Sequence, residues 1–132
     1  MPRHLRFQSQ PWATHHVTSR CFRGYAFLKP TPQIKSMCAG TLAYSLKHYE
    51  GRVELNHLSF LSNHFHILLS TRQATDLAEF MCHFKSNLSR ELGKVHDWDK
   101  TFWEGPYFSE EIVDEGALKD VFKYITQNSV KE

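Results

Sequence analysis

Hydrophobic residues recur along this chain at two different spacings, and the order of those spacings limits the possible folds more than any other feature. Apolar and polar residues alternate over residues 15–21, 52–61 and 64–70, which is the period of a half-buried strand. Over residues 32–49 and 77–95 the apolar residues recur every three or four positions, which is the period of an amphipathic helix. The pattern therefore predicts the order strand, helix, strand, strand, helix.

Two further elements complete this order near the end of the chain. Residues 107–113 are typical of a fourth strand, and a last helix is predicted from an apolar stripe of Leu118, Val121, Phe122 and Ile125. The first six elements match the ferredoxin-like split βαβ pattern. We therefore expect an α+β fold, with an antiparallel sheet, helices on one face and an added C-terminal helix. The whole chain, 1–132, is expected to form a single domain.

Short polar signals indicate where the helices begin. Thr31 followed by Pro32 predicts an N-cap and a first helical position for the first helix. Asp76 and Glu79 have the spacing of a capping box, so the second helix is expected to begin just after Asp76. Asp114 is expected to cap the last helix.

Charge is distributed unevenly between the two parts of the chain. Residues 1–49 contain seven Lys or Arg and no Asp or Glu, whereas residues 50–132 contain nine basic and fourteen acidic side chains. A basic segment of this kind indicates a polyanionic partner, and nucleic acid is the usual one. A solvated basic surface without a partner is the alternative on this feature alone.

The cysteines and the hydropathy indicate a compartment. Cys21, Cys38 and Cys82 are an odd number without paired spacing, which favours small buried side chains in a reducing compartment over a disulfide framework. No apolar run approaches the roughly 18 residues of a membrane span. The first residues also lack the apolar run of a signal peptide. We therefore expect a cytoplasmic protein without a membrane partner.

A pair of histidines is the sharpest local feature. His64 and His66 flank Phe65 in a predicted strand, and residues two apart point to the same face. The two imidazoles should therefore project together while Phe65 and Ile67 face the core. Two adjacent imidazoles are a natural half of a metal site, although two exposed or hydrogen-bonded histidines would produce the same pattern.

Tyr124 is the second feature. It lies roughly 110° around the last helix from the centre of the apolar stripe, which places it off the core. Asn128 follows one turn later on the same face and could offer an amide oxygen to a hard metal ion. Packing at a core boundary with a wetted hydroxyl is the alternative role for this tyrosine.

Four blocks of sequence resemble one family, in the family's order and over nearly the whole chain. The chain resembles REP-associated tyrosine transposases, which are HUH-type single-strand DNA transposases with one catalytic tyrosine. The blocks are His16-Val-Thr-Ser-Arg-Cys21, Leu61-Ser-Asn-His-Phe-His-Ile-Leu-Leu69, Phe102-Trp-Glu-Gly-Pro-Tyr-Phe-Ser109 and Tyr124-Ile-Thr-Gln-Asn-Ser-Val-Lys131. Pro106 and Ser129 depart from the residues expected there, a basic residue and a proline.

The resemblance implies a metal-dependent endonuclease and strand transferase. Tyr124 would be the nucleophile that forms a covalent phosphotyrosine, and His64, His66 and Asn128 would bind the divalent metal, Mg²⁺ or Mn²⁺. The substrate would be single-stranded or hairpin DNA. The resemblance leaves open whether the protein is a monomer or a homodimer.

Basic and polar side chains are the candidates for holding DNA. They lie in the acid-free part of the chain and on the polar face of the second helix: Arg20, Arg23, Lys29, Asn87, Arg90 and Lys94. Trp98, Trp103 and Tyr107 could stack on unpaired bases, and ordinary core packing is at least as good an explanation for each.

Two other functions remain open at this point. A non-catalytic ferredoxin-like nucleic-acid-binding domain would explain the charge distribution but would leave the histidine pair and Tyr124 without a role. A zinc hydrolase built on His64 and His66 would need a third strong ligand and a general base, and the sequence contains no His-Glu-x-x-His motif.

Overall fold

The computed structural model describes residues 7–131, with the side chains of Phe122 and of residues 126–131 outside that description. The main elements follow the predicted order and are β1 (Ala13–Arg20), α1 (Pro32–His48), β2 (Val53–Phe60), β3 (His64–Thr71), α2 (Ala74–His96), β4 (Phe108–Ile112) and α3 (Glu115–Lys131). One short 3-10 helix, Phe22–Gly24, follows β1. None of the described helices is long and apolar enough to cross a bilayer.

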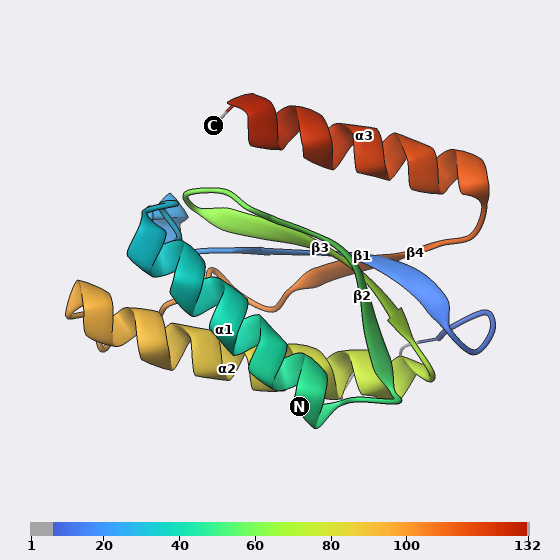
Figure 1. The fold of residues 1–132 in the computed structure, drawn as a ribbon, viewed down its shortest axis with the longest axis horizontal. Coiled ribbons are helices and arrows are strands. Elements are labelled where there is room, and N and C mark those ends of the chain that lie inside the picture. Colours follow the sequence, from blue (N-terminus) through green and yellow to red (C-terminus); the bar gives the residue numbers. More distant parts are fainter. Residues whose placement is uncertain (1–6, 132) are drawn as a thin grey trace.

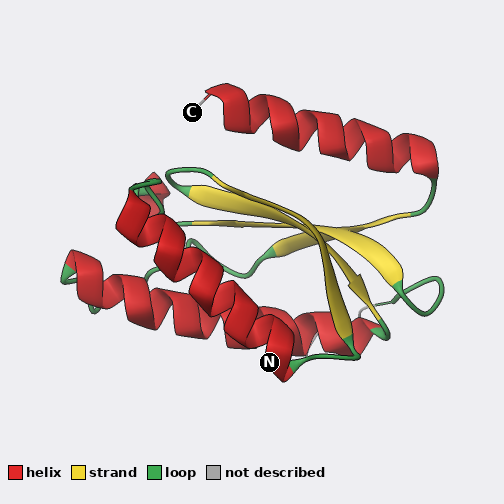
Figure 2. Ribbon diagram, viewed as in Figure 1, coloured by secondary structure: helices red, strands yellow, loops and turns green. Residues whose placement is uncertain are grey.

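The four strands form one antiparallel sheet in the order β2-β3-β1-β4. This arrangement confirms the predicted α+β, ferredoxin-like fold. Helices α1 and α2 cover one face of the sheet, and α3 lies across the other face (Figures 1 and 2). Strands β1 and β3 are central, so side chains on them are supported from both sides.

The main core fills the layer between the sheet and the α1–α2 pair. Phe65 and Ile67 of β3 are fully buried there, as the strand alternation predicts, and Phe80 and Phe84 of α2 pack against the same layer. Because side chains alternate along β3, burying Phe65 and Ile67 on this face directs the even-numbered residues to the α3 face.

The helix starts agree with the sequence at two of three positions. The Thr31 side chain accepts a hydrogen bond from the Ile34 amide at 3.2 Å, and Asp114 accepts one from the Ala117 amide at 2.7 Å. The expected start of α2 was wrong by one turn. Gln73 is the N-cap, and Asp76 sits at the third helical position and accepts a hydrogen bond from the Gln73 amide at 3.1 Å.

Helix α2 ends three residues after Gly93. The carbonyl of Trp98 folds back so closely that a Cβ at Gly93 would lie 2.7 Å from its oxygen, which explains a glycine inside the helix. Cys21 and Cys38 are buried as expected. Cys82 is exposed, which corrects the expectation that all three cysteines are core residues.

Candidate active site on the α3 face of the sheet

His64 and His66 project side by side from β3 on the face that α3 crosses. Their ring centroids lie 5.0 Å apart, with planes at 79°. His66 is 4 % exposed, and His64 is half-buried at the beginning of the strand. The predicted juxtaposition of the two imidazoles is therefore present in the structure.

Tyr124 reaches this histidine pair from α3. Its ring stands edge-on to that of His66, with centroids 5.7 Å apart and planes at 88°. The tyrosine is 55 % exposed, whereas its neighbour Ile125 is completely buried. The helix is thus anchored by Ile125 while Tyr124 keeps access to solvent, as its position off the apolar stripe predicts. The fold joins residues that are nearly sixty positions apart in the sequence.

The surroundings of His66 contain a third histidine, His16, that was not among the predicted site residues. His66 Nδ1 lies 2.9 Å from His16 Nε2 and 3.2 Å from the Thr18 hydroxyl, both on β1. His16 Nδ1 lies 3.2 Å from a carboxylate oxygen of Glu110 on β4. Only the sheet order and register reveal this cluster, because sequence periodicity does not say which strands are neighbours.

The electrostatic environment keeps His66 neutral. Burial lowers the pKa of His66 to about 4, and the nearby His64 and His16 add to the shift, since a charged imidazole is disfavoured beside others. His66 Nε2 is buried and has no hydrogen-bond partner among the described residues. A neutral imidazole with an unused buried nitrogen is the form that binds a metal ion.

His64 is held in place by its preceding residue. Its Nδ1 lies 2.7 Å from the Asn63 side-chain oxygen, and an amide oxygen can only accept, so Nδ1 carries the proton. The Nε2 of this ring is therefore the nitrogen with the lone pair. Both histidines have Nδ1 engaged by the protein, which fits a divalent cation bound through Nε2 atoms.

The described residues offer two candidate ligands for such an ion, His64 and His66. They contain no cluster of three or more His, Cys, Asp or Glu able to hold a metal ion. The Asn128 backbone belongs to α3, one turn after Tyr124, but its side chain lies outside the described residues. Its assignment as third ligand stays a prediction.

The six candidate DNA-binding residues fall on separate surfaces. Arg20 lies directly opposite His64 in the sheet, and Arg23 and Lys29 are exposed near the same end. Asn87 instead lines a groove between α1 and α2. Arg90 and Lys94 line an open cavity of about 750 Å³ at the C-terminal part of α2.

The three aromatic residues proposed to stack on bases, Trp98, Trp103 and Tyr107, are partly buried and pack against the core. Trp98 and Trp103 also line the cavity beside Arg90 and Lys94, and their indole nitrogens donate to the carbonyls of Thr101 and Lys85. The packing role is therefore present for both tryptophans, while a stacking role is a separate prediction.

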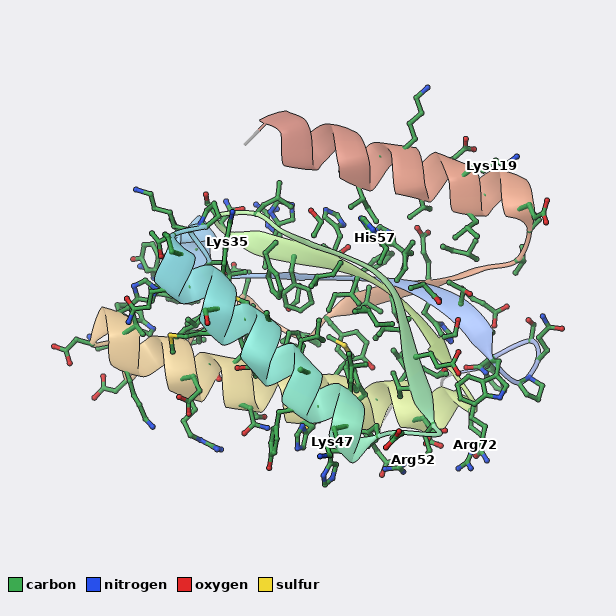
Figure 3. All side chains as sticks on the ribbon, in the orientation of Figure 1. Lys35, Lys47, Arg52, His57, Arg72 and Lys119 are labelled. Carbon is green, nitrogen blue, oxygen red and sulfur yellow. The ribbon has the colours of Figure 1, made fainter. Side chains whose placement is uncertain are left out.

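A further cavity lies between α3 and the sheet and was not predicted. It measures about 550 Å³, within the usual range for ligand sites, and its apolar part is formed by Leu68 and Leu118. Its polar lining consists of Thr14, Asn56, Ser70, Lys119 and Lys123. Figure 3 places Lys119 on α3 and shows His57 of β2 on the side of the sheet that faces this helix. The cavity is next to the tyrosine, because Lys123 precedes Tyr124 and Leu68 lies two residues after His66.

Comparison of the chain with known proteins identifies a matching family. The family model described as "Transposase IS200 like" matches residues 15–128, which include both histidines and the tyrosine. The chain belongs to the IS200-like transposase family. No curated protein matches it.

Solved structures of two transposases share the fold of this IS200-like transposase. A REP-associated tyrosine transposase bound to a REP hairpin has a TM-score of 0.76 and 18 % identity, over 99 % of this chain and 74 % of that one. A candidate transposase from Deinococcus radiodurans R1 has a TM-score of 0.61 and 15 % identity, over 96 % of this chain and 97 % of that one. These matches confirm the fold. The resemblance inferred from the four sequence blocks is confirmed by the family model.

Proposed function

We propose that this IS200-like transposase cuts and rejoins single-stranded DNA through a covalent bond between Tyr124 and a DNA phosphate. The observation that carries the proposal is the edge-on contact between Tyr124 and His66, with His64 beside them, in a member of this family. A nucleophile next to two imidazoles able to bind a metal ion is an arrangement suited to phosphodiester transfer.

The chemical step balances without a nucleotide cofactor. The Tyr124 hydroxyl loses its proton and its oxygen forms a bond to phosphorus as the bond from phosphorus to a deoxyribose oxygen breaks. The departing oxygen takes up one proton, so protons balance overall. The phosphotyrosine replaces one phosphodiester by another, so the reverse attack by a DNA hydroxyl restores the strand and releases the tyrosine.

His64, His66 and Asn128 are the residues proposed to hold Mg²⁺ or Mn²⁺. When bound, such an ion supplies Lewis-acid stabilisation of the negative charge on the phosphate oxygens. The neutral state of His66 and its buried, unpaired Nε2 favour this role. Mn²⁺ accepts nitrogen ligands more readily than Mg²⁺ does.

The substrate is proposed to be unpaired DNA, within or beside a hairpin. Arg20 lies opposite His64 in the sheet, and we propose that its guanidinium contacts the phosphate that Tyr124 attacks. Lys119 and Lys123 extend positive charge along the cavity beneath α3. The REP-associated relative of the same fold was solved with a REP hairpin, which supports a hairpin ligand for this chain.

A search for the covalent adduct tests the proposal. The full chain would be incubated with Mn²⁺ and a labelled hairpin carrying single-stranded flanks, then denatured and digested for mass spectrometry. A nucleotide attached to the peptide that contains Tyr124 is the expected result. Cleavage without a protein adduct, or an adduct on another residue, would contradict the proposal, as would equally fast cutting of perfect duplex.

A non-catalytic nucleic-acid-binding domain is the alternative outcome of the same experiment. It predicts hairpin binding with no strand cleavage at any metal concentration. The Tyr124–His66 contact favours the enzyme, because simple DNA binding does not need a half-exposed tyrosine above a buried histidine.

A further inference from the structure

We propose that His16 and Glu110 are positioning residues that fix the tautomer and ring orientation of His66 for metal binding; this inference rests on the proposed metal site. Glu110, His16 and His66 lie on β4, β1 and β3, three strands that are adjacent in the sheet. Glu110 is directly opposite His16 in the β1–β4 ladder. The three side chains therefore form a row across the α3 face of the sheet.

The row is continuous at the level of individual atoms. The Glu110 carboxylate lies 3.2 Å from His16 Nδ1, and His16 Nε2 lies 2.9 Å from His66 Nδ1. The two imidazole rings are nearly parallel, with planes 15° apart and centroids at 5.1 Å. Both ring nitrogens of His16 are thus engaged, and the Nδ1 of His66 is occupied from one side.

The Glu110 carboxylate at the end of the row determines which ring nitrogens of His16 and His66 carry protons. A carboxylate only accepts hydrogen bonds, so His16 Nδ1 must carry the proton that it shares with Glu110. With one proton on the ring, His16 Nε2 is an acceptor, and His66 Nδ1 must donate to it. His66 Nε2 is then the nitrogen with the lone pair.

That lone pair is on the atom that the protein leaves without a partner. His66 Nε2 is buried and unpaired among the described residues, although leaving a buried polar atom without a partner is unfavourable. A cation bound through His66 Nε2 would give this buried nitrogen the partner that it lacks. Metal-bound histidines generally donate their other N–H to a carboxylate or carbonyl, and here the carboxylate acts through one intervening imidazole.

The side chain of Glu110 points to the α3 face because of its position in β4. Glu111, the next residue, points to the opposite face, where it accepts a hydrogen bond from the Ser9 amide at 2.7 Å. The Thr18 hydroxyl is a second neighbour of His66 Nδ1, but it lies farther away, at 3.2 Å. Glu111 therefore provides a matched control on the same strand, and Thr18→Val measures the contribution of the hydroxyl.

The first experiment reads the tautomer in the metal-free protein. Long-range ¹H–¹⁵N correlation spectra of the ¹⁵N-labelled full chain at neutral pH distinguish protonated from unprotonated ring nitrogens. We expect His66 to be protonated on Nδ1 and unprotonated on Nε2, and His16 Nδ1 to be protonated. A proton on His66 Nε2 would overturn the proposal whatever the activity of the protein.

The second experiment measures Mn²⁺ affinity by calorimetry, without DNA. Glu110→Leu and His16→Leu should weaken Mn²⁺ binding by about 10- to 100-fold, while Glu111→Gln should leave it unchanged. His16→Gln should restore most of the affinity, because its amide can donate to Glu110 and accept from His66. Equal affinity in wild type and both Leu variants would overturn the proposal, as would failure of Gln to exceed Leu.

These outcomes are separable from a failure of the proposed function. If wild type forms the Tyr124 adduct but the Leu variants bind Mn²⁺ normally, the positioning role is wrong and the function stands. If Mn²⁺ affinity follows the pattern above but no adduct forms, the positioning role stands and the cleavage function is wrong.

Discussion

The ring of Tyr124 stands perpendicular to that of His66, with 5.7 Å between their centroids. This contact joins the helix on one side of the cavity to the central strand below it. Ile125, the next residue, is fully buried and fixes the helix against the molecule. The hydroxyl of Tyr124 therefore belongs to an exposed side chain on an anchored backbone, so it can be removed with little effect on folding.

Tyr124→Phe should abolish the covalent protein–DNA adduct, with a loss on the order of 10³-fold or more, because the attacking oxygen is gone. The free energy of unfolding should change by no more than about 0.5 kcal/mol, since the side chain is 55 % exposed. Denaturing gels with a labelled hairpin and Mn²⁺ measure the adduct. Tyr44→Phe is the matched control, being 61 % exposed but on α1. An adduct in Tyr124→Phe would rule out this nucleophile.

His64→Ala should weaken Mn²⁺ binding by at least about 100-fold and stop cleavage, because one of two imidazole ligands is lost. DNA affinity should remain close to wild type, since phosphate contacts supply most of it. His48→Ala, on α1 in the opposite layer, should change neither quantity. Calorimetry measures the Mn²⁺ affinity, and a gel-shift assay at fixed salt measures the DNA affinity. Normal cleavage by His64→Ala, or by wild type in chelator, would argue against a metal site here.

The fold could be predicted from the sequence because the spacing of hydrophobic residues distinguishes the strands from the helices and gives their order. The alternation around Phe65 and Ile67 gave both the core face and the direction of the two histidines. The exact start of α2 was not predictable in the same way, because Gln73, Asp76 and Glu79 all have side chains able to cap. The structure selects Gln73 and Asp76, which satisfy each other's backbone and side-chain groups.

The interactions of His66 with His16, and of His16 with Glu110, could not be predicted from the sequence for a different reason. His16 and Glu110 are 94 positions apart and become neighbours only through the β1–β4 register. His16 opens one of the four sequence blocks, but that block assigned it no role, and Glu110 belongs to none of them. The cavity under α3 was missed likewise, because Asn56 and Lys123 meet only when the helix crosses the sheet.

Removing both lysines of the α3 cavity should weaken binding of single-stranded DNA. Lys119→Ala with Lys123→Ala should lower the slope of log affinity against log salt by about 1.4, since each lost single-strand phosphate contact removes about 0.7. Fluorescence anisotropy over a range of salt concentrations measures this slope. Lys35→Ala with Lys47→Ala, both on α1 (Figure 3), is the control and should leave the slope unchanged. Equal slopes in the two double variants would exclude DNA from the cavity.

Lys85 should make stability depend on alkaline pH. Burial lowers the pKa of Lys85 to about 8, and its ammonium donates to the Gly105 carbonyl at 3.0 Å. Between pH 8 and the ordinary value of 10.5, the unfolded chain keeps a proton that the folded chain has lost, so this group's contribution to stability rises with pH. The difference in free energy of unfolding, wild type minus Lys85→Met, should therefore increase over that range in urea titrations. A flat difference would contradict the lowered pKa.

The last prediction separates two adjacent amides on α3, Gln127 and Asn128, either of which could complete the metal site. Asn128 follows Tyr124 by four residues, about 40° around the helix axis, so it shares the face that meets His66. Gln127 is roughly 170° from the centre of the apolar stripe and should point away from the sheet. Asn128→Ala should therefore weaken Mn²⁺ binding by at least about tenfold and impair cleavage severely, while Gln127→Ala should change little.

Calorimetric Mn²⁺ titrations and adduct assays on these two variants decide between the amides. Asn128→Asp adds a useful third case, because a carboxylate oxygen can still bind a hard cation and should retain affinity where alanine loses it. The two residues share a helix and differ by one position, so a change common to both would indicate helix destabilisation. A large loss in Gln127→Ala with Asn128→Ala near wild type would mean that the ligand face of α3 is rotated by one residue, and the third ligand would have to be reassigned.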